Sequence, residues 1–421
     1  KVKQLPPRNR VAEADTWDLS SLFKSDKAWE KSLKKLESRI PEYAKFRGKL
    51  GRSAASLRAA LDLDAEVDRL AERLGCYAYL RSCTDQTEAA AQRMLGRFQN
   101  IATRAGEGSS FMRPEIMAIP AAKMKSLLAA KELSDYQLLL KRLRRFKKHT
   151  LSGKEEQLLA MQCEMAGSAG RVFNKLLDAD MKFGTVENEE GKQVELSNAT
   201  LSQFLQSPKQ AVRKAAFRQY YEQFTGHQNC LAAAFSGSVQ KDVYYARARG
   251  YDSALHNALL PDNVPQTVYD NLITAVRKNL PAVHHYYDVR RRKMKLKKIH
   301  FYDTYVPILT GMKKKFTWKQ ACKLILDALQ PLGNEYCTAL EEGLNGRWCD
   351  KYPNKAKRSG AFSYGVYDGL PYILMNYQPS VLGDVFTLAH EAGHSMHTWY
   401  SVRKQPFIYY NYTIFVAEVA S

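Results

Sequence analysis

The chain has 421 residues, of which 45% are hydrophobic and 25% charged, and its formal net charge is +21. These proportions are typical of an ordinary soluble globular protein, and the length allows two or three domains or one large helical body. No window approaches the roughly 18 consecutive apolar residues of a membrane-spanning helix, so an integral helical membrane protein is excluded.

The first residues and the cysteines bear on the compartment. Residues 1–19 contain no apolar core of a signal peptide, although the chain begins with Lys rather than Met, so a removed leader or a missing piece stays open. The seven cysteines are scattered and form no C-x-x-C pair, which disfavours both a disulfide framework and a thiolate zinc site. We therefore expect reduced thiols and a cytoplasmic protein that has no membrane contact.

Positive charge is concentrated in the segments 141–149 (KRLRRFKKH) and 290–298 (RRRKMKLKK). Such runs can bind phosphate groups, and they support one alternative, a basic helical protein that binds nucleic acid. The competing interpretation is that they are solvated helix faces. No helix-turn-helix, zinc-finger or RNA-binding signature accompanies them, so nucleic acid is not the expected partner.

Most of the chain has the hydrophobic periodicity of helices. In residues 28–40, Trp29, Leu33, Leu36 and Ile40 recur at helical spacing behind Ser25, a candidate N-cap. Residues 56–74 repeat this pattern, and residues 199–250 are again helical. No internal repeat of about 30–45 residues is visible, which disfavours a solenoid. The prediction is a mainly α fold with many helices.

Two segments interrupt the helical pattern. Residues 181–197 carry an acidic, Gly-containing turn between β-prone arms and predict a hairpin, after which Ser197 can cap a helix. We place the domain boundary here, with an N-terminal helical domain at 1–198 and a catalytic domain at 199–421. Residues 360–377, rich in aromatic and branched residues, predict two short strands that lead into the next helix.

The segment HEAGHSMH (390–397) carries the chemistry. On a helix, residues four apart share a face, so His390 and His394 can bind one metal ion. Glu391 is rotated by about 100° from His390, which suits a base that reaches a water on the metal better than it suits a ligand. Asp384 is a candidate N-cap of this helix. The competing interpretation is two incidental histidines on a buried helix.

A third ligand has two known sources in zinc peptidases. The longer pattern H-E-x-x-H-x-x-G-x-x-H fails, because His397 and Tyr400 occupy its last two fixed positions. A glutamate on a later helix is the other source, and Glu418 is the only acidic residue after Glu391. If the site has such a ligand, it must be Glu418.

The remaining histidine and the ion follow from the same geometry. His397 lies about 10 Å along the helix from His390, so we expect it to support the ligands from behind or to pack, rather than to bind the ion. Two imidazoles and one carboxylate leave one tetrahedral position for water and predict a single Zn²⁺. Zinc would lower the pKa of that water and Glu391 would accept its proton, which predicts hydrolysis of an acyl bond, most simply of a peptide.

At this point an ordered set of segments resembles oligoendopeptidase F, within the thimet-type family of zinc oligopeptidases. The resemblance covers nearly the whole chain. The segments are TWDLSSLF (16–23), KDVYYARARGYDSAL (241–255), FYDTYVP (301–307), KRSGAFS (357–363), PYILMNY (371–377), LAHEAGHSMH (388–397) and FVAEVAS (415–421). Each string alone is weak evidence, but their order along the chain is specific.

The resemblance implies a zincin-type peptidase fold with a deep channel and a small β-sheet beside the metal helix. Short unstructured oligopeptides would enter this channel and be cleaved at internal bonds. It also implies that His390, His394 and Glu418 bind zinc and that Glu391 is the catalytic base. A peptide would pair with the strand near 371–377, with Asn376 and Tyr377 as candidate substrate contacts; ordinary strand packing is the alternative for both.

The chain departs from the family after Glu418. Family members continue well beyond this helix and supply His and Tyr residues that stabilise the tetrahedral intermediate, whereas here nothing follows Ser421. We therefore expect a C-terminally truncated chain, for which a separate complementing chain is one partner. The alternative is a catalytically silent remnant that binds peptides or a partner.

Overall fold

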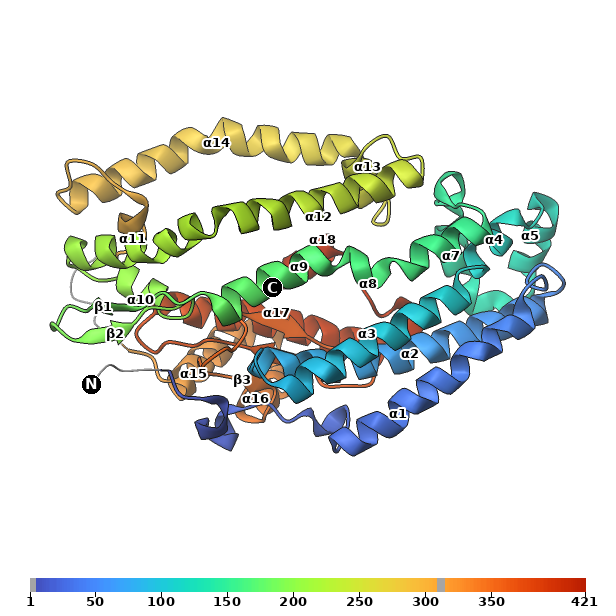
Figure 1. Cartoon of the computed structure of the whole chain (residues 1–421), viewed down its shortest axis with the longest axis horizontal. Coiled ribbons are helices and arrows are strands. Elements are labelled where there is room, and N and C mark those ends of the chain that lie inside the picture. The colour runs from blue at the N-terminus through green and yellow to red at the C-terminus, as the bar shows by residue number, and fades with distance from the viewer. Residues whose placement is uncertain (1–4, 309–314) are drawn as a thin grey trace.

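The structure, a computed structural model, describes residues 5–308 and 315–421. Most of these residues are helical, and the long helices lie roughly along the longest axis of the molecule (Figure 1). Among the described helices, none is long and apolar enough to cross a membrane. The prediction of a mainly α fold is confirmed.

The N-terminal part is built on three long helices, α1 (Asp26–Arg39), α2 (Ala54–Thr84) and α3 (Ala89–Ser109). Ser25 caps α1 as predicted, since its hydroxyl oxygen accepts the N–H of Ala28 at 3.2 Å. Trp29 and Leu33 are completely buried between these helices. The amphipathic pattern of 28–40 therefore faces the core, as its spacing predicts.

Shorter helices follow α3 and then give way to longer ones. Their bounds are α4 (Met112–Ala118), α5 (Ala121–Ala129), α6 (Gln137–Arg144), α7 (Gly153–Met161), α8 (Cys163–Ala166), α9 (Ser168–Lys175), α10 (Leu201–Leu205), α11 (Gln210–Gly226), α12 (Gln228–Ala248), α13 (Ala254–Leu259), α14 (Gln266–Lys293), α15 (Trp318–Leu329), α16 (Asn334–Asn345), α17 (Leu382–Lys404) and α18 (Ile414–Ala420).

The predicted hairpin is present. Strands β1 (Thr185–Glu187) and β2 (Gln193–Glu195) pair antiparallel, with Val186 opposite Val194. The next helix starts later than predicted: Ser197 accepts the N–H of Thr200 in a turn, and α10 begins one residue after Thr200. The domain boundary at 198 stays a prediction.

A small sheet is formed within the C-terminal part of the chain. It has the order β3-β5-β4, and the two predicted strands, β4 (Phe362–Tyr364) and β5 (Tyr372–Leu374), pair antiparallel. The sequence analysis missed β3 (Cys349–Asp350), which pairs parallel with β5. The expectation that a peptide pairs with the strand near 371–377 is therefore wrong, because both edges of β5 are already hydrogen-bonded to neighbouring strands.

Two of the recognised motifs form ion pairs, one fully buried and one partly buried. In the 301–307 motif, Asp303 is fully buried, and its carboxylate accepts a hydrogen bond from the guanidinium of Arg213 at 2.7 Å. In the 241–255 motif, Arg249 forms two hydrogen bonds of 2.6 and 2.7 Å with the carboxylate of Glu156. Arg–carboxylate pairs of this kind are geometrically specific and hold distant segments together. Both motifs thus connect helices rather than supply groups to the metal helix.

The basic run at 290–298 does not form one continuous charged patch. Arg290 is buried and donates to the backbone carbonyls of Asp303 and Val306. Arg291 and Arg292 pair with Asp288 one turn earlier on α14. Part of this positive charge is therefore neutralised or used internally.

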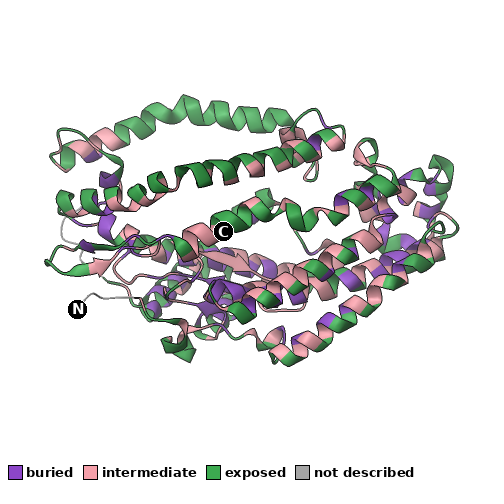
Figure 2. Cartoon of the chain, viewed as in Figure 1, coloured by how far each residue is buried: buried purple, intermediate pink, exposed green. Residues whose placement is uncertain are grey.

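Long apolar faces on the helices α12 and α14 are open to solvent. Nearly the whole of α14 is exposed (Figure 2), including Leu272 at 63% and Val276 at 56%. On α12, Phe235 is 73% exposed. Large exposed apolar faces are typical of interaction surfaces.

Candidate metal centre

The metal-motif helix α17 lies against the small sheet. Its apolar residues Leu388, Ala392 and Met396 are buried in the core that also holds Ile373 of β5. The helix begins at Leu382, so the expectation that Asp384 is its N-cap is wrong. Asp384 instead lies in the first turn, where its carboxylate accepts the N–H of Gln378 at 2.7 Å. This bond fixes the chain as it enters the helix.

Three side chains converge at one point of the surface of α17. The Nε2 atoms of His390 and His394 are 3.2 Å apart. One carboxylate oxygen of Glu418, on α18, lies 4.0 Å from each of them. The structure therefore brings together the three residues that the sequence analysis selected, although Glu418 is distant from the histidines along the chain.

The geometry of this group fits a divalent metal ion. The ligand atoms of His390, His394 and Glu418 all lie within 4.8 Å of one another. From the three separations, a point exists that is about 2.2 Å from all three atoms, which is the usual length of metal–nitrogen and metal–oxygen bonds. Two neutral imidazoles and one carboxylate are a common ligand set for transition metals.

Glu391 lies beside this group and is only 7% exposed. Burial raises the pKa of its carboxyl group, while His390 and the backbone N–H of Ser363 lower it, and the net shift is upward. A carboxylate in such a site is a better proton acceptor than one in water. Its position agrees with the expectation that Glu391 is a base rather than a ligand.

The strand β4 runs next to the metal helix. The backbone N–H of Ser363, at its centre, lies near the carboxylate of Glu391 and lowers its pKa, and the hydroxyl oxygen of Ser363 lies 2.8 Å from that of Ser395 on α17. β4 is an edge strand of the described sheet and lies beside Glu391. The sequence analysis missed Ser363 and Ser395, since isolated serines carry no signal in a single sequence.

Gly393 lies between the two histidines and permits the close approach of α18. A Cβ atom at this position would lie 2.6 Å from the carbonyl oxygen of Ala420 and 2.7 Å from Cα of Ser421. Only glycine avoids these clashes. The helix that carries Glu418 can thus pack directly on the histidine turn of α17.

His397 does not belong to the converging group. Its ring stacks on Tyr412, with ring centres 3.5 Å apart and planes inclined by 11°. The hydroxyl of Tyr412 is in turn hydrogen-bonded to Thr398 at 2.7 Å. Burial lowers the pKa of His397, as does the nearby His394. These contacts describe a packing role beside the site.

The two candidate substrate contacts are engaged within the protein. Tyr377 is only 1% exposed, and its hydroxyl donates to the carbonyl of Phe316 at 2.8 Å. Asn376 donates its amide N–H groups to the carbonyls of Arg358 and Gly360. The structure gives no support to a substrate contact by Tyr377, and that of Asn376 stays a prediction.

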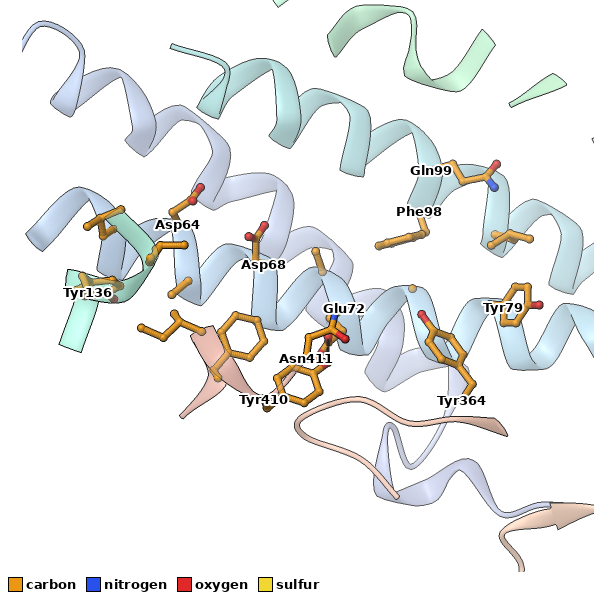
Figure 3. Close-up of a pocket in the computed structure, with 18 residues that line it drawn as sticks. Asp64, Asp68, Glu72, Tyr79, Phe98, Gln99, Tyr136, Tyr364, Tyr410 and Asn411 are labelled. Carbon is orange, nitrogen blue, oxygen red and sulfur yellow. Dashed lines mark hydrogen bonds between the residues drawn. The ribbon is translucent and has the colours of Figure 1, made fainter. Parts of the chain in front are cut away.

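A cavity of about 660 Å³ lies between α2, α3 and the segment around η10 (Phe407–Tyr409). Asp64, Asp68 and Glu72 project into it from successive turns of α2, opposite aromatic rings such as those of Tyr136 and Tyr410 (Figure 3). Tyr364 of β4 also lines this cavity, so the cavity adjoins the strand that faces Glu391.

Comparison with known proteins agrees with this geometry. The family model described as "Peptidase family M3" matches residues 203–421, and the one described as "Oligopeptidase F" matches residues 115–183. Oligopeptidase PepF of Bacillus subtilis is 39% identical over 422 aligned positions, which cover 100% of this chain and 63% of that protein. An oligoendopeptidase F homolog of Borreliella burgdorferi is 37% identical over 98% of this chain and 69% of its own length.

The fold agrees as well. The crystal structure of oligoendopeptidase-F from Enterococcus faecium superimposes with a TM-score of 0.70 and 26% identity, covering 94% of this chain and 65% of that one. The chain thus spans about two thirds of the length of these relatives. On the family models and on these two curated relatives, the chain belongs to peptidase family M3, among the oligoendopeptidase F proteins.

Proposed function

We propose that the chain is the metal-binding part of a zinc-dependent oligoendopeptidase that hydrolyses internal bonds of short, unstructured peptides. The single observation that carries this proposal is the convergence of His390, His394 and Glu418 beside the buried Glu391. Membership of peptidase family M3 and the names of the relatives, oligopeptidase and oligoendopeptidase, support the substrate class.

Each residue of the site would have a distinct role. His390, His394 and Glu418 would hold one Zn²⁺, which supplies Lewis-acid activation of a water and of the peptide carbonyl. Glu391 would accept the proton of the attacking water and later transfer it to the leaving amine. The nearby N–H of Ser363 favours the ionised form of Glu391. His397 keeps the adjacent turn of α17 packed through Tyr412.

The substrate would bind to β4 rather than to β5. An extended peptide adds a strand to an exposed sheet edge through main-chain hydrogen bonds. In the described sheet β4 is an edge strand, and it leads past Glu391. Strand addition to β4 would replace the strand addition near 371–377 and would bring a peptide bond close to the metal ligands.

Glu391→Gln tests the assignment of the base. The variant should retain zinc, because Glu391 is not among the three converging ligands, but its cleavage of a fluorescence-quenched peptide should fall by at least about a hundredfold, the usual contribution of a general base. Glu341→Gln on the exposed side of α16 is the control and should cleave at the parent rate. Cleavage by Glu391→Gln at the parent rate would contradict the proposal.

A separate complementing chain is the partner that the exposed apolar faces favour. Its occupant on α12 and α14 would be a polypeptide that corresponds to the part of the relatives which this chain does not cover. Residues on α18 such as Phe415, 72% exposed, would also be covered. We further expect the protein to be cytoplasmic and to make no use of nucleic acid or membranes.

Complementation is testable with the corresponding segment of the B. subtilis relative. Mixed with this chain, the segment should form a complex of one copy each in analytical ultracentrifugation and should raise peptide cleavage, because it would add groups that stabilise the transition state. If no complex forms in the mixture and the rate of peptide cleavage is unchanged, the proposal of a complementing chain is contradicted. A chain that binds zinc and peptide but never cleaves would be the silent remnant.

A further inference from the structure

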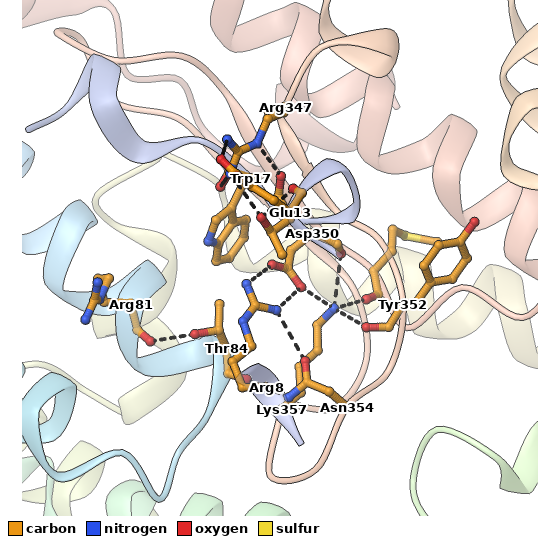
Figure 4. Close-up of polar contacts among 12 residues, drawn as sticks. Arg8, Glu13, Trp17, Arg81, Thr84, Arg347, Asp350, Tyr352, Asn354 and Lys357 are labelled. Atoms are coloured by element: carbon orange, nitrogen blue, oxygen red, sulfur yellow. Dashed lines mark hydrogen bonds and ion pairs between the residues drawn. The ribbon is translucent and has the colours of Figure 1, made fainter. Parts of the chain in front are cut away.

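A lysine near the start of the segment that leads to β4 is completely buried. Four oxygen atoms surround the ammonium group of Lys357 (Figure 4). They are the carboxylate of Asp350 at 2.6 Å and the backbone carbonyls of Asp350 at 3.2 Å, Tyr352 at 2.7 Å and Met375 at 2.6 Å. These oxygens come from β3, from the loop after it and from the residue after β5, so one ammonium group connects two strands and a loop.

The carboxylate of Asp350 is shared with an arginine from the other end of the chain. Arg8 forms a two-pronged pair with it, with one contact of 2.9 Å, and also donates to Asn354 (Figure 4). Burial alone would raise the pKa of Asp350, but Lys357 and Arg8 outweigh it and lower the pKa. Asp350 is therefore ionised at neutral pH, whereas burial lowers the pKa of Lys357 and the facing Asp350 raises it.

Hydrogen bonds fix most of the residues between Lys357 and β4 individually. The N–H of Arg358 donates to the carbonyl of Cys83 at 2.9 Å, and the N–H of Ser359 to Asp178 at 3.3 Å. Asn376, next to Met375, donates to the carbonyls of Arg358 and Gly360. Gly360 has a φ of +77°, a left-handed conformation that glycine adopts without strain.

A buried charge of this kind is not the simplest way to stabilise a fold. Apolar residues of similar volume often stabilise an interior as well as an ion pair does, because charges lose their hydration when they are buried. What the ammonium adds is directionality, since it fixes three carbonyls that belong to different segments. Residues 357–361 run directly into β4, whose Ser363 lies beside Glu391.

We propose that Lys357 is a positioning residue for peptide binding: its buried ammonium fixes residues 357–361 and thereby sets where the free edge of β4 lies relative to Glu391 and the metal ligands. Asn376 acts with it from the opposite side of the segment. This inference rests on the proposed function, because it assumes that a peptide binds to the edge of β4.

The test measures peptide binding in the absence of turnover. In the Glu391→Gln background, a labelled peptide is titrated onto the zinc-loaded chain and its Kd is read by fluorescence anisotropy. A second version of the peptide carries one N-methylated amide, which cannot donate a main-chain hydrogen bond. The amide chosen is the one whose methylation weakens binding to the parent most. Lys357→Met is compared with Lys351→Met, a control that contacts Asp15 and the carbonyl of Ala14 but neither β5 nor the 357–361 segment.

If Lys357 positions β4, Lys357→Met should weaken binding of the unmethylated peptide about tenfold, the value of one or two hydrogen bonds, and binding of the methylated peptide far less. Lys351→Met should leave both Kd values unchanged. The inference would be overturned if Lys357→Met weakened the binding of both peptides equally, because a general structural defect would affect both alike. It would also be overturned if binding of neither peptide were weakened.

Asn376→Ala decides the question if Lys357→Met does not fold. It removes only the two bonds to the carbonyls of Arg358 and Gly360, and it should show the same selectivity for the unmethylated peptide with a smaller effect. Equal weakening of both peptides in this variant would overturn the inference. Absence of any binding by the parent would contradict the proposed function itself, whereas parent binding with unselective variants would contradict only the role of Lys357.

Discussion

Gly393 shows how one residue without a functional group shapes the candidate metal centre. It lies on the turn of α17 between the two histidines, where α18 passes closest to the helix. Because Glu418 is carried by α18, the distance between the two helices sets the distance between the carboxylate and the imidazoles. The absence of a side chain at position 393 is therefore required for Glu418 to come close enough to act as the third ligand.

Gly393→Ala should weaken zinc binding without changing any ligand. The added Cβ would clash with Ala420 and Ser421 and displace Glu418, and we expect a loss of affinity of about tenfold or more, as for other changes that misplace a metal ligand. Gly383→Ala in the same helix is the control, since its Cβ would meet only Val381, at 3.9 Å. Zinc titration by competition with a chelator measures both, and equal affinities would contradict this role.

At the residue scale, the sequence alone was sufficient to select the three candidate metal ligands. The four-residue spacing of His390 and His394 and the scarcity of acids after Glu391 selected the residues that the structure brings together. It was not sufficient for Gly393 or Ser363, because their roles depend on which segments pack on α17. Spacing along one helix is visible in a sequence, whereas contact between distant segments is not.

At the scale of single elements, α2 carries an unusual row of acids into the cavity beside β4. Desolvation raises the pKa of Asp68, and together with the neighbouring carboxylates of Asp64 and Glu72 it brings that pKa to about 7. Among the described residues, no N–H or O–H donates to Asp68. Tyrosines face the row from the other elements around the cavity, namely Tyr136, Tyr364 and Tyr410.

Asp68→Asn should stabilise the chain at pH 8 but not at pH 4. The folded-state pKa of Asp68 is above its value of about 3.9 in the unfolded chain, so the cost of ionising it grows as the pH rises from about 4 to 7 and then stays constant. Because Asp68 remains accessible to water through the cavity, we expect a modest rise in Tm of about 2 °C at pH 8. Thermal unfolding at the two pH values measures it, and an equal shift at both would argue against this explanation.

The type of each element could be predicted from the sequence, but the way in which the strands pair could not. The helix at 28–40, the hairpin at 181–197 and the strands within 360–377 follow from local periodicity and turn residues. The pairing of β3 with β5 could not be predicted, because β3 has only two residues and its partner lies far along the chain. That pairing is what makes β5 a central strand and leaves β4 at the edge.

At the scale of the whole molecule, segments far apart in sequence enclose the small sheet. The side chains of Trp17 and Tyr372 pack edge to face, and Arg8 reaches Asp350 at the end of β3. The exposed apolar faces of α12 and α14 lie in another part of the fold (Figures 1 and 2). The small sheet on which the metal helix packs is thus supported by the N-terminal segment, while the exposed apolar surface belongs to helices after the hairpin.

Zinc binding by the parent chain and by Glu418→Ala tests the central claim most directly. Metal analysis after dialysis, together with titration against a chelator, should give one zinc per parent chain. It should also give an affinity at least about a hundredfold lower for Glu418→Ala, because only the two imidazoles would remain as protein ligands. Parent stoichiometry and affinity in Glu418→Ala would contradict the claim that His390, His394 and Glu418 together hold the metal.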